Sequence, residues 1–320
     1  MTKRAMGNLV NRYRSVLKKC HLINTFGSLA VAAILVMGVT DGEAFSNAVG
    51  YNVTSTSTPG TTVSATDTSE NAVASGIKAE TSATYSVPST ITRAEATAIG
   101  KQSALSFGVF AQSSSGNRLT VNLAPLDISS TAVTENGTSQ SVGIYSDVNS
   151  SVSVHGGTIV SSAHSKNGIG EAFGAMSQNN SSVTLGADTI VASSESSKHL
   201  SDPRSVGIYF SDNSTFNVTS NRIRVDVSAT HNGDVFSRTV NGIYGDKNST
   251  LTMNDADISV REINSTPDKS GAAGIHLLTA STLAMKDASI RVAAVDHEGT
   301  FAGSAVGIVT SPTSGRHDIT

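Results

Sequence analysis

A repeat of about 33 residues constrains the fold of this chain more than any other feature. A Gly followed by an apolar residue recurs at intervals of 31 to 35 residues along most of the chain. The repeated glycines are Gly76, Gly108, Gly143, Gly174, Gly207, Gly242, Gly274 and Gly307. Self-similarity at a period of 20 to 50 residues is the signature of repeat proteins. The chain is therefore expected to fold as a stack of similar units.

Five of these units, beginning at Gly143, share apolar positions at fixed distances from the Gly. An apolar residue follows each Gly, two more lie nine and eleven positions on, and an Ile lies sixteen positions on. The Ile residues are Ile159, Ile190, Ile223, Ile258 and Ile290. Polar and apolar residues alternate between these positions, which is typical of short, half-buried strands. Each unit is expected to form three short strands followed by a polar segment of variable length.

Stacking of such units predicts an all-β protein, a right-handed parallel β-helix. One unit cannot bury its own apolar face, whereas stacked coils can, with strands about 4.8 Å apart. We expect about seven to eight coils over residues 76–310, after a Ser/Thr-rich lead-in at residues 45–75. A β-propeller and a sandwich of short strands are the alternatives. A propeller blade needs about 40 residues and four strands, so it fits the repeat less well.

An Asn six positions after the Gly predicts a structural ladder. The residues are Asn149, Asn180, Asn213 and Asn248, and Ala280 takes this place in the fifth unit. Each is followed by Ser. Asn tolerates the left-handed backbone conformation of a tight turn. In stacked coils, its side-chain amides can also bond one another.

A second column lies two positions after the Gly and is rich in aromatic residues. It contains Tyr145, Tyr209 and Tyr244, with Met176 and His276 in other units. Such a row of tyrosines could form a surface stripe that stacks on sugars or anchors a protein. The interpretation favoured here is instead a stack that stabilises neighbouring coils.

The first 44 residues have the pattern of a secretory signal peptide. Six basic residues and no acidic residue occur before position 22, and an apolar stretch follows at Leu29–Val39. The small residues Gly42 and Ala44 flank Glu43, so cleavage is expected after Ala44. We expect the apolar stretch to be helical. An uncleaved membrane anchor over Leu22–Thr40 is the alternative, but the apolar stretch is shorter than the ~20 residues that span a bilayer.

The long basic region gives this leader a family resemblance. The segment NRYRSVLKKCHLINTFGSLAVAAILVMG resembles the extended signal peptide of autotransporters, the type V secreted proteins of Gram-negative bacteria. The expected β-helix is similar to their passenger domains. The resemblance implies export through the Sec translocon and an outer-membrane β-barrel partner. It places the protein in the periplasm, on the outer-membrane surface or outside the cell.

The end of the chain departs from that family pattern. No alternating strands of a membrane barrel follow the repeat, and the chain stops at Thr320 within the coil begun at Gly307. Residues 311–320 lack the Asn-Ser step and the strand after it. We therefore expect a truncated, uncapped end, as in a fragment or a truncated gene product.

Composition excludes several classes of function. A single Cys cannot form a disulfide framework or a Cys-based zinc site. The net charge of −3 is unlike that of a nucleic-acid binder, which carries a basic stripe. The eight His residues form no zinc-protease motif. No cofactor, metal or nucleic-acid partner is expected.

The expected function is that of an adhesin-like surface scaffold, which is not an enzyme and binds a host-surface or glycan ligand. This expectation follows from the family resemblance, because a fold alone does not fix a function. The alternative is a β-helical polysaccharide lyase or hydrolase that uses Asp212 and Asp246, which fall in adjacent coils. The interpretation favoured here is that those residues cap turns. A trimeric adhesin is a third alternative, but neither short head repeats nor a heptad stalk is visible.

Overall fold

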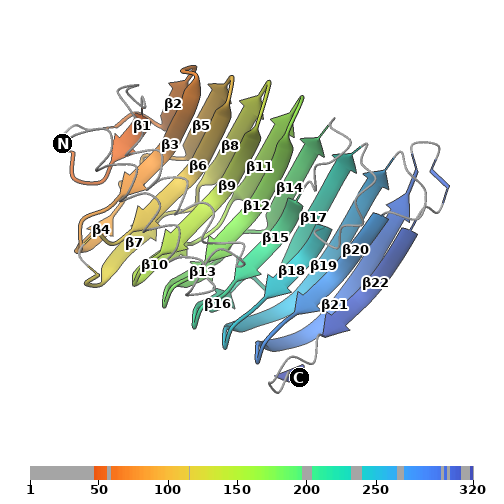
Figure 1. Cartoon of the computed structure of the whole chain (residues 1–320). Coiled ribbons are helices and arrows are strands. Elements are labelled where there is room, and N and C mark those ends of the chain that lie inside the picture. The colour runs from red at the N-terminus through yellow and green to blue at the C-terminus, as the bar shows by residue number, and fades with distance from the viewer. Residues whose placement is uncertain are drawn as a thin grey trace, which may run out of the picture. The chain divides into compact units, whose positions relative to one another are not determined.

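The protein forms a parallel β-helix in the computed structural model (Figure 1). The structure describes residues 47–55, 59–114, 116–196, 204–231, 240–264, 270–296, 299–300, 303–310 and 318–319. Every element in these ranges is a β-strand, and none of these residues belongs to a helix that could cross a membrane. The expected signal peptide, its cleavage site at Ala44 and most of residues 311–320 lie outside the described residues.

One side of the β-helix is a nine-stranded parallel sheet, called sheet A here. Each strand pairs with its counterparts one coil before and one coil after it, as β9 does with β6 and β12. The strands are β1 (Asn47–Asn52), β3 (Asn71–Ala79), β6 (Ser103–Gln112), β9 (Thr138–Asp147), β12 (Ile169–Ser177), β15 (Arg204–Phe210), β18 (Val240–Gly245), β20 (Ser270–Leu277) and β22 (Gly303–Thr310).

The other two sides belong to one 14-stranded sheet. Face B contains β4 (Thr84–Ser86), β7 (Leu119–Leu123), β10 (Ser150–Val154), β13 (Ser182–Leu185) and β16 (Thr215–Val218). Face C contains β2 (Thr62–Asp67), β5 (Arg93–Gly100), β8 (Asp127–Thr134), β11 (Thr158–Ser165), β14 (Thr189–Ser196) and β17 (Arg222–His231). The long strands β19 (Thr250–Asn264) and β21 (Thr282–Val295) run through both faces, because their first residues pair on face B and their later residues on face C.

Each coil of the β-helix passes from sheet A to face B and then to face C. Seven coils, from β3 to β21, visit all three sides, which confirms the predicted β-helix. Five of them have the predicted three strands, whereas in the last two coils β19 or β21 supplies both face B and face C as one continuous strand. The core lies between the three sides and contains the apolar columns that the repeat predicted. The column on face B is Val121, Val152, Val183, Phe216, Leu251 and Leu283. Burial of these columns requires neighbouring coils, since no coil encloses its own apolar residues.

The β-helix begins earlier than the repeat indicated. Residues 45–75 were expected to be a lead-in without repeats, but β1 pairs with β3, and β2 pairs with β5. Gly50 takes the same place in β1 as Gly76 takes in β3. The spacing of 26 residues between them is shorter than in later coils, so the pattern was missed. At the other end, Asp318–Ile319 forms the two-residue strand β23 beside β21, where no strand was expected.

One Ile of the aligned units does not occupy the expected column. In the coil that begins at Gly207, two extra residues separate β16 from the face C column. Val225, rather than Ile223, therefore lies between Ile190 and Ile258. Ile223 is still buried, but it pairs with Ala256. The alignment without gaps was wrong at this position because the insertion lies inside the unit.

A chain of buried serines lies where sheet A approaches face C. The hydroxyl oxygens of Ser106, Ser130, Ser141 and Ser161 are linked in sequence, each 2.9 Å from the next. All four residues have no exposed surface. Hydrogen bonds offset the cost of burying these polar groups. The sequence analysis did not single out these residues, because Ser is frequent throughout the chain.

Candidate functional site

A two-residue turn in the left-handed conformation joins each sheet A strand to the next strand on face B. The second residue of the turn is Asn149, Asn180, Asn213, Asn248 or Ala280, with φ between 54° and 60°. The first residue is Val148, Asn179, Asp212, Lys247 or Thr279, also with positive φ. The prediction that the repeated Asn occupies a left-handed turn position is confirmed. Asn suits this position because its side chain tolerates positive φ better than most others.

The backbone of these turns is bonded from coil to coil. The Asn149 N–H donates to the Asn179 carbonyl at 3.1 Å, and the Asn180 N–H donates to the Asp212 carbonyl at 2.9 Å. The same bond joins Asn213 to Lys247 and Asn248 to Thr279. This ladder is made by the backbone. The predicted bonds between Asn side-chain amides do not occur among the described residues, since the amide of Asn149 donates to the Gly116 carbonyl at 2.7 Å.

The Ser after each Asn is buried and bonds to the backbone of its own turn or of the preceding coil. Ser150, Ser181, Ser214, Ser249 and Ser281 are at most 2% exposed. The Ser150 hydroxyl donates to the Asp147 carbonyl, three residues earlier, and the Ser214 hydroxyl donates to the Ser177 carbonyl at 2.9 Å. The Ser of the Asn-Ser step is therefore structural, whereas the Asn side chain points outward.

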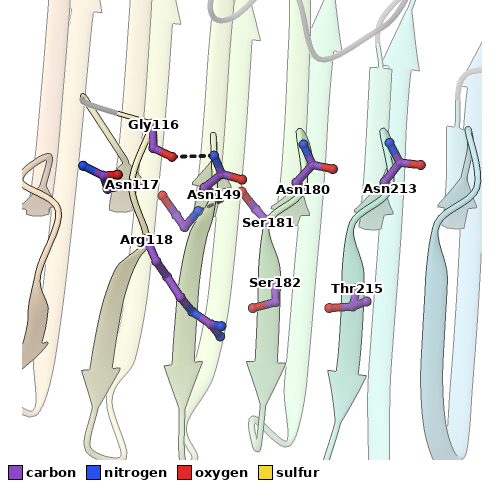
Figure 2. A pocket seen from close by; sticks show the side chains of 10 residues that line it. Gly116, Asn117, Arg118, Asn149, Asn180, Ser181, Ser182, Asn213 and Thr215 are labelled. Carbon is purple, nitrogen blue, oxygen red and sulfur yellow. Dashed lines mark hydrogen bonds between the residues drawn. The ribbon is translucent and has the colours of Figure 1, made fainter.

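The outward Asn side chains line a groove of about 570 Å³, called the Asn groove here. Its lining residues are Gly116, Asn117, Arg118, Asn149, Ser150, Asn180, Ser181, Ser182, Asn213 and Thr215. Figure 2 shows Asn149, Asn180 and Asn213 in one row, and Ser182 and Thr215 in a second row. The groove therefore crosses four coils and presents the same kinds of polar group on successive coils.

Face B continues the groove as an uncharged surface. Its outward residues on strands β7, β10, β13 and β16 are half-buried or exposed and are all Ser, Thr or Asn. These residues form two columns in register across the coils. The first column contains Thr120, Ser151, Ser182 and Thr215, and the second contains Asn122, Ser153, Thr184 and Asn217. Arg118, at the edge of this surface, is the charged residue of the groove lining.

The aspartates that the enzyme alternative needs lie in turns outside the groove lining. The Asp212 carboxylate accepts a hydrogen bond from the Lys247 ammonium at 2.8 Å and has a φ of 55°. Asp246 is 6% exposed, and its carboxylate accepts the backbone N–H of Lys247 at 2.8 Å. Burial raises the pKa of the Asp246 carboxyl above its ordinary value. Both residues support turns, which is the structural role considered for them from the sequence.

Asp147, at the same place in another coil, is the centre of a buried polar cluster. Its carboxylate accepts hydrogen bonds from the Tyr145 hydroxyl at 2.8 Å and from the Asn179 amide at 2.6 Å. Burial raises the pKa of the Asp147 carboxyl, and these hydrogen bonds oppose that rise. The cluster joins sheet A to the first residues of the turn.

The tyrosine column is buried, which excludes the surface stripe that was considered from the sequence. Tyr145, Tyr209 and Tyr244 are at most 4% exposed. The rings of Tyr209 and Tyr244 stack with centroids 5.3 Å apart and an angle of 3°. His276 meets Tyr244 edge-on at 5.4 Å, and Phe110 stacks on Tyr145. The column is therefore the stack between coils that the sequence favoured, and a sugar cannot reach these ring faces.

The described residues contain no cluster of three or more His, Cys, Asp or Glu side chains that could hold a metal ion. On face C, a buried His–carboxylate pair joins His231 Nε2 to Glu262 Oε1 at 2.8 Å, and both side chains are at most 1% exposed. Glu262 also accepts the backbone N–H of Gly271. This pair links two adjacent coils through strands β17 and β19.

Comparisons with protein-family models, with curated proteins and with solved structures gave no match to this chain. The functional argument therefore depends on the sequence patterns and on the geometry of the Asn groove. Arg118 and Asn117 were missed by the sequence analysis. They precede β7 in a coil of 35 residues that aligns with the regular units only through a two-residue insertion.

Proposed function

We propose that this chain is an exported, surface-associated β-helical scaffold with an adhesin-like role and no catalytic centre. The Asn groove is the observation that carries this proposal. It presents polar side chains on successive coils, and the backbone beneath them is bonded from coil to coil. A rigid row of donors and acceptors suits an extended ligand, because little conformational freedom is lost on binding.

The proposed export depends on the leader pattern of residues 1–44. A basic region, an apolar stretch and a small-residue site before position 45 fit recognition by the Sec translocon. The resemblance to autotransporters adds an outer-membrane β-barrel as the partner in a longer form. We propose the periplasm, the outer-membrane surface or the medium of a Gram-negative bacterium as the destination.

The polysaccharide-active enzyme gains no support from the position of its candidate acids. Asp212 is bonded to Lys247 in a turn, and Asp246 is buried against the same turn. Neither residue lines the Asn groove. Glycoside hydrolysis needs two carboxyl groups that flank the scissile bond of a bound sugar.

Export is tested by producing the full chain, with a C-terminal tag, in a Gram-negative host and fractionating the cells. We expect a processed protein that begins at Phe45 and is found outside the cytoplasm. Ala44→Arg is the matched control, because it removes the small residue that signal peptidase requires. An unprocessed wild-type chain in the cytoplasm would contradict the proposal.

The adhesin-like role is tested by applying the purified protein to an array of immobilised glycans. Retention on a defined group of glycans, without release of shortened sugars, is expected for a binding scaffold. Release of cleaved oligosaccharides would favour the enzyme instead. Failure to bind any glycan or any host-cell surface would refute an adhesin-like role.

A further inference from the structure

Building on the proposed function, we infer that the Asn groove binds an acidic oligosaccharide that lies across successive coils. The Arg118 guanidinium pairs with a sugar carboxylate. The amides of Asn180 and Asn213 form hydrogen bonds with sugar hydroxyls. The ligand chain runs along the row of asparagines, so that successive sugars meet successive coils.

Arg118 supplies the charge of this site. It is exposed, and its guanidinium makes no ion pair or hydrogen bond with the described residues. In Figure 2 its side chain extends from the strand β7 side of the groove in the direction of Ser182. A guanidinium offers five donors in a planar fork that matches a carboxylate. Among the described residues, no carboxylate lines the groove to compete for it.

The asparagines supply neutral hydrogen-bonding groups. Asn180 and Asn213 are exposed, and their side-chain amides have no partner among the described residues. Asn149 differs, because its amide is already bonded to the Gly116 carbonyl. An amide offers two donors and a carbonyl oxygen, which suits a hydroxyl group that both donates and accepts.

The turn fixes the backbone of these two asparagines before a ligand arrives. The backbone N–H groups of Asn180 and Asn213 each donate to the next coil at 2.9 Å. The φ angles of the two residues, 59° and 60°, are nearly the same. Both Asn Cα atoms are therefore fixed, and only side-chain rotations are lost on binding.

The lining selects an acidic sugar over other anionic or extended ligands. A nucleic acid would need several cations along its phosphates, whereas this groove has one. A protein partner would need a buried apolar or aromatic anchor, and every lining side chain is polar or absent. A ligand rich in hydroxyls with an occasional carboxylate matches rows of amides and hydroxyls beside one guanidinium.

The test is titration calorimetry of the purified full chain with two matched probes. The first probe is an oligogalacturonate hexamer, and the second is the same hexamer with its carboxylates methyl-esterified. We expect the acidic hexamer to bind at least about tenfold more tightly, because only it pairs with Arg118. Arg118→Gln should weaken binding of the acidic hexamer by about tenfold and remove most of the difference between the probes.

Glycine variants separate the groove from the fold of the turn. Asn180→Gly with Asn213→Gly removes both amides while keeping residues that accept positive φ, and should weaken binding about tenfold. Asn248→Gly is the matched control, because Asn248 occupies the same turn but does not line the groove. It should bind as the wild type does.

The inference would be overturned by equal binding of the two hexamers or by wild-type affinity in Arg118→Gln. It would also be overturned if Asn248→Gly lost as much affinity as the Asn180→Gly, Asn213→Gly double variant. Absence of binding to both hexamers would also overturn it. The proposed function would then still stand if the exported protein bound other glycans on the array. It would fail separately if no surface or glycan were bound.

Discussion

At the scale of single residues, the left-handed turns are where side-chain identity matters most. Two consecutive residues adopt positive φ in five coils, and Asn fills the second position in four of them. The first position is less uniform and includes Val148 at a φ of 49°. A β-branched residue is poorly suited to this conformation, since its Cβ substituents crowd the backbone. The stack of coils holds Val148 in place despite that cost.

Val148→Asn should therefore stabilise the protein. We expect its free energy of unfolding to rise by about 0.5–1 kcal/mol, because Asn adopts positive φ at lower cost than Val. Urea denaturation followed by circular dichroism measures the change. Val191→Asn, on the outward side of strand β14, is the control and should bring no gain. A variant at Val148 that is no more stable than the wild type would mean that the turn carries no strain.

A second residue-scale prediction concerns pH. Burial raises the pKa of Asp147 in the folded state, and Glu171 and Asp246 are shifted in the same direction. The folded chain then binds protons more readily than the unfolded chain, whose Asp carboxyls titrate near about 3.9. The free energy of unfolding should therefore increase as the pH falls from above the raised pKa values of these carboxyls towards their pKa in the unfolded chain.

Thermal unfolding between pH 7 and pH 4 measures this effect. We expect the Tm of the wild type to rise on acidification through the upper part of that range. Asp147→Asn should reduce the slope of Tm against pH, because one of the three shifted groups is gone. Asp188→Asn, which changes an exposed carboxyl, is the control variant. A slope that is the same in Asp147→Asn would show that this carboxyl is not linked to folding.

At the scale of elements, the repeated Gly of sheet A, from Gly108 in β6 to Gly274 in β20, marks where two sides of the coil approach closely. A Cβ added to Gly174 would lie 2.1 Å from Ile190 Cγ2 and 2.6 Å from the Gly207 carbonyl oxygen. The Gly repeats because the branched side chain of face C repeats opposite it. Backbone on one side and a packed core residue on the other leave no room for a methyl group.

Gly174→Ala should consequently destabilise the protein by about 2–3 kcal/mol, through overpacking. The measurement is urea denaturation at fixed pH. Gly60→Ala is the matched control, since a Cβ there would meet only the Thr62 carbonyl oxygen at 3.9 Å. The control should change stability by less than about 0.5 kcal/mol. Equal stability of the two variants would contradict the proposed close approach.

Elements of the fold were predictable wherever the period stayed constant. The repeat identified one residue on each side of a coil, namely Gly143 on sheet A, Val152 on face B and Ile159 on face C. The structure places all three in the predicted strands. Where the period changed, the prediction failed. The short spacing between Gly50 and Gly76 concealed the coil that contains Gly50. An insertion in the coil that begins at Gly207 moved Val225 into the place assigned to Ile223.

The candidate site was less predictable than the fold. The Asn row could be found because a local backbone requirement repeats in sequence. Burial of the tyrosines could not be found from the sequence. Alternation shows which residues share a side of a strand, but it does not show what covers that side. Arg118 occurs once and belongs to no repeated position. Its place beside Asn149 and Asn180 follows from the stacking of coils in space.

At the scale of the whole described β-helix, contacts are made mainly between one coil and the next. Strand β12, for example, pairs with β9 and β15. Stability in such a stack is a sum of coil and interface terms. Removal of one complete coil should therefore leave a foldable protein, provided that the phase of every side chain is kept.

Deletion of residues 143–173 tests this, because it joins Val142 directly to Gly174 and keeps the repeat in phase. We expect a folded β-protein with a single cooperative unfolding transition. Deletion of residues 143–174 is the control, since one further residue places apolar side chains on the wrong side of the strand. It should aggregate or lose cooperative unfolding. Similar behaviour of both deletions would mean that register is not set by the repeated Gly.

The shared position of Gly in every sheet A strand also bears on how the gene can change. Unequal recombination between two repeat units adds or removes whole coils in phase, because the crossover joins one Gly-apolar pair to another. Each added unit of the Asn-Ser type brings one more amide to the Asn groove at a spacing of about 4.8 Å. Lineages could thus lengthen or shorten the ligand that fits while inheriting the same core.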